Sequence, residues 1–145
     1  MECEKIYLDT ENTEVFLDCY IADSLNGYKR KAMLVIPGGG YGCICSDREG
    51  EPIAQAFIAK GYNAFILHYS VGGRRAFPAQ LIEASMAIKH IRDNAENYGI
   101  DPKNVFVVGF SAGGHLAGCL ATMWQKDDIY AELKMPFGII SLRES

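Results

Sequence analysis

The stretch Val105-Phe106-Val107-Val108-Gly109-Phe110-Ser111-Ala112-Gly113-Gly114 decides the fold class of this chain. Its first four residues are apolar and of the kind that form buried strands. The residues after it, 115 to about 124, are rich in small side chains and helical in pattern. A strand, a Gly-x-Ser-x-Gly pattern and a helix, in that order, bend the chain sharply and present the serine as a nucleophile. The stretch therefore predicts an α/β fold and makes Ser111 a candidate catalytic residue.

The residues around Ser111 are small, as such a bend requires. Gly109 and Gly113 occupy places where a side chain would clash, and Gly114 adds further room. The first amide of the helix, that of Ala112, points to where negative charge would develop on a substrate oxygen. A glycine-rich helix start that only packs closely is the alternative interpretation.

A second glycine segment favours the nucleophile over close packing. Pro37-Gly38-Gly39-Gly40-Tyr41 ends an apolar run at 32–36, and three glycines at the end of a strand can direct free amides at an oxyanion. A flexible turn or a phosphate loop is the alternative, but a nucleotide-binding loop would continue with Gly-Lys-Ser or Gly-Lys-Thr. With both segments in order, we predict that Ser111 is the nucleophile.

Apolar runs alternate with helical segments from residue 32 onward, which predicts a mainly parallel sheet with flanking helices. Two short runs at 6–8 and 15–20 are expected to form an antiparallel pair of strands. Further strands are expected at 32–36, 64–67, 105–108 and 137–140, and helices at about 51–60, 78–98 and 115–124. Asp101-Pro102 is expected to be a turn. One face of the long helix carries its apolar residues, Leu81, Ala84, Ile88 and Ile91.

Composition narrows the function classes. A chain of 145 residues is expected to form one domain, 1–145, and its net charge of −4 without a basic stripe weighs against nucleic-acid binding. Its five cysteines are scattered and odd in number, unlike a disulfide framework, and Cys43-x-Cys45 lacks the second pair of a zinc site. We expect no metal and no cofactor. Without a signal-peptide pattern or an apolar run of ~20 residues, we expect no membrane association and a cytoplasmic location.

Three side chains are candidates for the lining of a pocket. Tyr41 follows the glycine segment and either covers the pocket or packs as an ordinary aromatic residue. His115 lies about one turn after Ser111 on the same helix, within conceivable reach of it, but a packing or hydrogen-bonding role is expected. His68 ends a strand at the sheet edge where sites gather, and packing at the core or rim is again expected.

The remaining polar residues near these segments have ordinary expected roles. His90 is expected on the surface of the long helix. Asp47 and Glu49 follow the glycine segment and are expected to cap a helix or pair with Arg48 rather than orient a base.

Several motifs together resemble the α/β-hydrolase fold and, within it, bacterial esterases and lipases of the acetyl-esterase or acetylxylan-esterase type. The likeness extends from about Lys31 to Ile140. The segments that carry it are Pro37–Tyr41, Ser46–Ala54, Gly61–Phe65, Phe77–Ala79 and Gly109–Ala117.

The resemblance implies a serine hydrolase of carboxylic esters that forms an acyl-enzyme on Ser111. It implies an oxyanion hole made by the amides of Gly39, Gly40 and Ala112. Small acyl esters, including those of acetylated carbohydrates, are the implied small-molecule substrates.

The resemblance also implies two further strands, one followed by an Asp and the next by a His, to complete the catalytic set. The sequence departs from the family near Ser141 and contains neither strand. We therefore expect a C-terminally truncated α/β-hydrolase domain, with poor activity or none. A non-catalytic remnant with a binding or structural role is the alternative. The sheet edge at 137–140, left uncovered, predicts a homo-oligomer.

Overall fold

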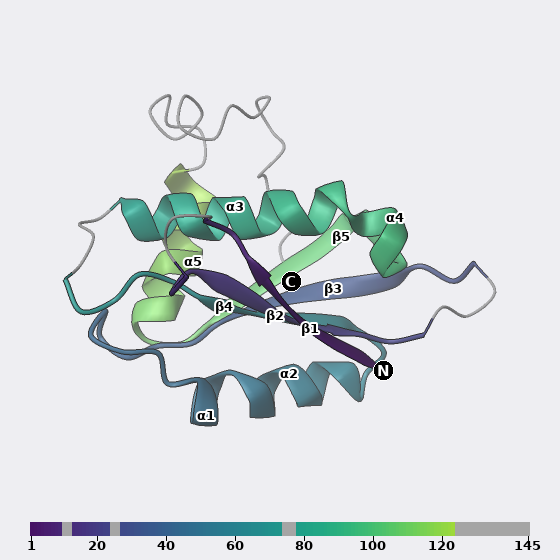
Figure 1. Ribbon diagram of the computed structural model, residues 1–145, viewed down its shortest axis with the longest axis horizontal. Coiled ribbons are helices and arrows are strands. Elements are labelled where there is room, and N and C mark those ends of the chain that lie inside the picture. The colour runs from purple at the N-terminus through teal and green to yellow at the C-terminus, as the bar shows by residue number, and fades with distance from the viewer. Residues whose placement is uncertain (10–12, 24–26, 74–77, 124–145) are drawn as a thin grey trace.

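A single mixed sheet organises the computed structural model, which describes residues 1–9, 13–23, 27–73 and 78–123 (Figure 1). Three strands of the sheet are parallel: β3 is paired with both β4 and β5. β2 is antiparallel to β4, and β1 is antiparallel to β2. The strand order is β1-β2-β4-β3-β5, and the bounds are β1 (Glu2–Tyr7), β2 (Phe16–Ile21), β3 (Arg30–Ile36), β4 (Asn63–His68) and β5 (Ile100–Gly109). The mainly parallel sheet and the N-terminal antiparallel pair are confirmed.

Helices cover both faces of the sheet, as Figure 1 shows, with α1 and α2 on one side and α3, α4 and α5 on the other. Their bounds are α1 (Ser46–Glu49), α2 (Glu51–Ile58), α3 (Ala79–Asp93), α4 (Ala95–Tyr98) and α5 (Ala112–Met123). Every helix in the described ranges is too short or too polar to span a bilayer.

The central strand β3 contributes to two separate cores. Leu34 and Ile36 pack on the side of α3 and α5, whereas Met33 and Val35 pack on the side of α2. This alternation follows from the two-residue period of a strand. The predicted apolar face of α3 is confirmed, since its four residues are fully buried in the first core: Leu81, Ala84, Ile88 and Ile91.

Asn63 fastens the beginning of β4 to two other parts of the chain. Its side chain is fully buried, and its Oδ1 accepts a hydrogen bond from the amide of Ala22 at 2.9 Å. Its Nδ2 donates to the carbonyl oxygen of Tyr98 at 2.8 Å. One buried side chain thus satisfies a backbone donor after β2 and a backbone acceptor at the end of α4.

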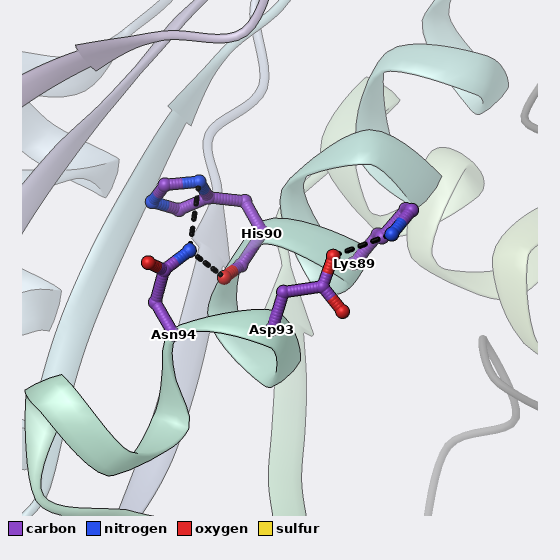
Figure 2. A network of polar contacts seen from close by, with 4 residues as sticks. All are labelled: Lys89, His90, Asp93 and Asn94. Carbon is purple, nitrogen blue, oxygen red and sulfur yellow. Dashed lines mark hydrogen bonds and ion pairs between the residues drawn. The ribbon is translucent and has the colours of Figure 1, made fainter.

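The long helix expected up to residue 98 ends earlier, at Asp93. Figure 2 shows the amide of Asn94 turned back onto His90, donating to its carbonyl oxygen at 2.8 Å and lying 3.4 Å from its Nδ1. The other ring nitrogen of His90 lies 2.7 Å from the hydroxyl of Tyr98. His90 is therefore half-buried under α4, and the expectation of a surface histidine is wrong.

Two other local expectations differ from the structure. Asp101-Pro102 lies within β5 rather than in a turn before it. The pairing of β5 with β3 shifts in register there, because Arg30 pairs with Ile100 while Ala32 pairs with Val105. The carboxylate of Asp101 accepts a hydrogen bond from the amide of Lys103 at 2.9 Å within this irregular segment. Pro102, which has no amide hydrogen to donate, therefore lies where the hydrogen bonds between the strands are interrupted. The helix α1 was not expected.

The strand expected at 137–140 lies outside the described residues. The sheet-edge homo-oligomer inferred from that strand therefore stays a prediction.

Candidate active site

Ser111 occupies the tight bend between β5 and α5. Its φ of 54° lies in the left-handed region that non-glycine residues rarely adopt, and its side chain is exposed. Hydrogen bonds fix the bend on both sides: Phe110 N donates to Ile36 O at 3.2 Å, and Gly113 N donates to Phe110 O at 2.9 Å. The backbone strain predicted for this serine is present, held in place by the adjoining strand β3.

Close backbone contacts explain why the bend is flanked by glycines. A side chain at Gly113 would collide with the carbonyl oxygens of Ile36 and Pro37, and one at Gly109 would collide with the backbone of Gly113. These contacts let α5 begin directly against the end of β3.

The triple-glycine segment lies against the same bend. A Cβ at Gly38 would collide with the carbonyl oxygen of Phe110 and would come within 2.9 Å of the Cβ of Ser111. Gly39 and Gly40 both have positive φ, at 141° and 63°, conformations that strongly favour glycine. The structure thus brings together the two glycine-rich segments that the sequence singled out.

Glu49 supports the glycine segment from α1. Its Oε1 accepts a hydrogen bond from the amide of Gly38 at 3.0 Å. The expected pairing with Arg48 is found for Asp47, at 3.7 Å, whereas for Glu49 the structure shows this contact with the glycine segment instead. The composition of residues 46–50 gives no signal for this, because the acceptor is defined by where one backbone amide points.

Tyr41 and His115 connect the glycine segment to α5. The hydroxyl of Tyr41 lies 2.6 Å from Nδ1 of His115, and their rings meet edge to face with centroids 5.9 Å apart. His115 Nε2 is also 3.5 Å from the sulfur of Cys119. The hydrogen-bonding role expected for His115 is confirmed. Tyr41 in turn packs edge to face on Tyr69, which donates to Pro37 O at 2.6 Å.

His68, the third pocket candidate, contacts side chains of β2 and not the bend at Ser111. Its ring stacks on Phe16 with centroids 4.1 Å apart, and its Nε2 lies 3.2 Å from Oδ2 of Asp18. Both partners belong to β2, which β4 separates from β3. Burial lowers the pKa of His68, and the nearby Asp18 carboxylate offsets part of this effect.

The described residues contain no group of three or more His, Cys, Asp or Glu side chains arranged to hold a metal ion. All five cysteines are free thiols.

Known proteins are similar to this chain over most of its length. Residues 17–137 match the BD-FAE family. Endo-1,4-beta-xylanase B of Butyrivibrio fibrisolvens is 43% identical over an alignment of 122 residues that covers 77% of this chain and 19% of that protein. Acetylxylan esterase of Xylanibacter ruminicola is 32% identical over 106 residues, 72% of this chain and 21% of that protein.

A solved structure gives the same picture. MGS-M1, an alpha/beta hydrolase enzyme from a Medee basin deep-sea metagenome library, superimposes with a TM-score of 0.79 at 49% identity, covering 84% of this chain and 51% of that one. The present chain thus spans about a fifth of the length of these two curated relatives and about half of this structure.

Proposed function

Since the chain belongs to the BD-FAE family and has an α/β-hydrolase fold, we propose that it is a carboxylic ester hydrolase with Ser111 as its nucleophile. The single observation that supports this most is the strained, exposed Ser111 at the end of β5, packed beside Gly38. A serine in this conformation projects its hydroxyl away from the sheet, toward a substrate.

The proposed reaction has two steps. The Ser111 oxygen attacks the acyl carbon while a base removes the serine proton, and the tetrahedral intermediate collapses to an acyl-enzyme as the alcohol leaves with a proton. Water then attacks the acyl-enzyme and releases the carboxylic acid. We assign the oxyanion-hole amides to Ala112, at the first position of α5, and to Gly39 and Gly40.

The identity of the base limits what this chain can do by itself. The imidazole rings of the three histidines contact Tyr41, Cys119, Tyr98, Asn94 and Asp18. The hydrogen bond between His115 and Ser111, 2.9 Å long, joins the backbone amide of His115 to the backbone carbonyl oxygen of Ser111 and leaves the serine hydroxyl out. A serine hydrolase without its base loses on the order of 10⁶ in kcat, while oxyanion donors and binding keep ~10³–10⁴ over water. We therefore propose weak turnover for this chain.

Small acyl esters are the proposed substrates, including acetylated carbohydrates. The support is the likeness to an acetylxylan esterase. Tyr41, held beside the glycine segment by His115, is proposed to border the acyl group.

The same arrangement of histidines favours one alternative, a non-catalytic α/β-hydrolase domain with a binding or structural role. Hydrolysis of p-nitrophenyl acetate separates the two. The proposal expects slow hydrolysis by the wild type, its loss in Ser111→Ala, and its retention in Ser46→Ala, a serine of α1 outside the bend. Equal rates of hydrolysis in the wild type and Ser111→Ala would contradict the assignment of Ser111 as the nucleophile. A wild-type rate equal to that of buffer would favour the alternative.

A further inference from the structure

Two cysteines lie immediately beside the triple-glycine segment. Cys43 is exposed and Cys45 is partly exposed, and both are free thiols. Their backbone amides bind that segment directly: Cys43 N donates to Gly39 O at 3.3 Å, and Cys45 N donates to Gly38 O at 2.9 Å. A conformational change at Cys43 or Cys45 therefore affects the hydrogen bonds that hold the backbone of Gly38 and Gly39.

Arg48 places positive charge against one of the two sulfurs. Its Nη2 donates a hydrogen bond to the sulfur of Cys45 at 3.0 Å. The thiolate, not the thiol, is the form of cysteine that attacks an electrophile, and neighbouring guanidinium groups favour it. Cys45 is partly exposed, which makes its thiol accessible to small oxidants.

The second thiol lies within reach of the first. The neighbouring Cys45 side chain is the largest cause of the raised pKa of the Cys43 thiol. Two successive Cα steps of about 3.8 Å keep these residues no more than about 7.6 Å apart. A disulfide needs a Cα separation of about 4.4–6.8 Å. The backbone at residues 43–45 therefore has to move only slightly for the two sulfurs to bond.

We propose that Cys43 and Cys45 form a redox site that a peroxide closes to a disulfide, with Cys45 as the residue that is oxidised first. The Cys45 thiolate attacks one peroxide oxygen, the O–O bond breaks, and hydroxide leaves, so that the sulfur becomes a sulfenic acid. The Cys43 sulfur then attacks the sulfur of the sulfenic acid, the S–O bond breaks, and water leaves with the thiol proton. Overall, the two thiols lose two electrons and the peroxide gains them. This site is independent of the proposed hydrolase function.

The other cysteines provide internal comparisons. Cys19 is buried in the core, and burial raises the pKa of its thiol to about 12, which disfavours the reactive form. Cys3 is exposed on β1, and it serves as the reference for simple accessibility.

The experiment treats the full chain with hydrogen peroxide, blocks the remaining thiols and maps the cysteines by mass spectrometry. Trypsin releases residues 32–48, a peptide whose only cysteines are Cys43 and Cys45. We expect this peptide to lose two hydrogen atoms before Cys3 is oxidised. In urea, where the contact with Arg48 is lost, this difference in rate should disappear.

Three variants assign the roles of Cys43, Cys45 and Arg48. Cys43→Ser should leave a sulfenic acid on Cys45 that dimedone captures. Arg48→Gln should slow the oxidation about two- to fivefold, as expected for one exposed charge contact. The proposal is overturned if the peptide keeps both thiols while Cys3 is oxidised, or if native and unfolded chains show the same order of oxidation. It is also overturned if dimedone labels Cys43 in Cys45→Ser as fast as Cys45 in Cys43→Ser.

Discussion

The carboxylate of Glu49 accepts a hydrogen bond from the backbone amide of Gly38 across 3.0 Å. Glu49 is half-buried at the end of α1, and Gly38 packs on the bend that carries Ser111. One acidic side chain thus holds the first glycine of the triple-glycine segment beside the candidate nucleophile.

Glu49→Ala is expected to destabilise the fold by about 1–3 kcal/mol, because the partly buried amide of Gly38 loses its charged acceptor. Glu49→Gln keeps an amide oxygen at the same place and should cost less. Asp47→Ala, at an exposed residue of the same helix, should stay within about 0.5 kcal/mol of the wild type. Urea denaturation measures all three, and equal stability of Glu49→Ala and Asp47→Ala would contradict the role of the contact.

Two neighbouring glycines of α5 provide a matched pair. Gly113→Ala should destabilise the fold by about 1–3 kcal/mol, because its new Cβ would collide with the carbonyl oxygens of Ile36 and Pro37. Gly114→Ala would meet Gly109 O at 3.3 Å, a contact that a small shift relieves, and alanine favours helix by about 1 kcal/mol. It should therefore be close to neutral. Thermal unfolding of the two variants checks this, and similar losses in both would rule out the predicted clash.

The contact between Tyr41 and His115 can be measured by a double-mutant cycle. Tyr41→Phe removes the hydroxyl that lies 2.6 Å from Nδ1 of His115 and keeps the ring, and His115→Ala removes the other partner. We expect a coupling energy of about 0.5–1.5 kcal/mol, the usual contribution of one hydrogen bond. Additive effects of the two substitutions on the free energy of unfolding would mean that the pair does not link the glycine segment to α5.

Acid should weaken the fold through two histidines. Burial lowers the pKa of both His68 and His90 from the ordinary value of 6.5. Below pH 6.5 these two histidines bind protons in the unfolded chain but stay neutral in the folded chain until the pH reaches their lowered pKa values. The free energy of unfolding is therefore highest above pH 6.5. It should decrease as the pH falls through 6.5 toward the lowered values. Urea midpoints between pH 8 and pH 5 measure the decrease, which His90→Gln should reduce. Stability that is constant or rises toward pH 5 would contradict this assignment.

Much of the fold could be predicted because burial is visible in the residue pattern. The run at 32–36 is apolar without interruption since β3 has helices over both faces, and the spacing of Leu81 and Ile88 follows one helix face. The bend at Ser111 could be predicted for the same kind of reason. Collisions at Gly109 and Gly113 restrict those positions to the smallest residue, and this leaves a recognisable pattern.

The features that could not be predicted depend on contacts between segments. α1 has only four residues, too few for a helical period to appear in the sequence. His90 is half-buried because α3 ends at Asp93 and Tyr98 then lies against it. Glu49 could not be distinguished from Asp47 by composition, since only the position of the Gly38 amide decides which carboxylate binds it.

Asn63 lies at the beginning of β4, whereas Ser111 and Gly38 follow the far ends of β5 and β3. Because these strands are parallel, the hydrogen bonds of Asn63 lie at one end of the sheet, and the proposed site around Ser111 lies at the opposite end. Laboratory evolution of this chain could vary the residues beyond the carboxyl ends of the strands to alter the proposed ester hydrolysis while Asn63 stays constant.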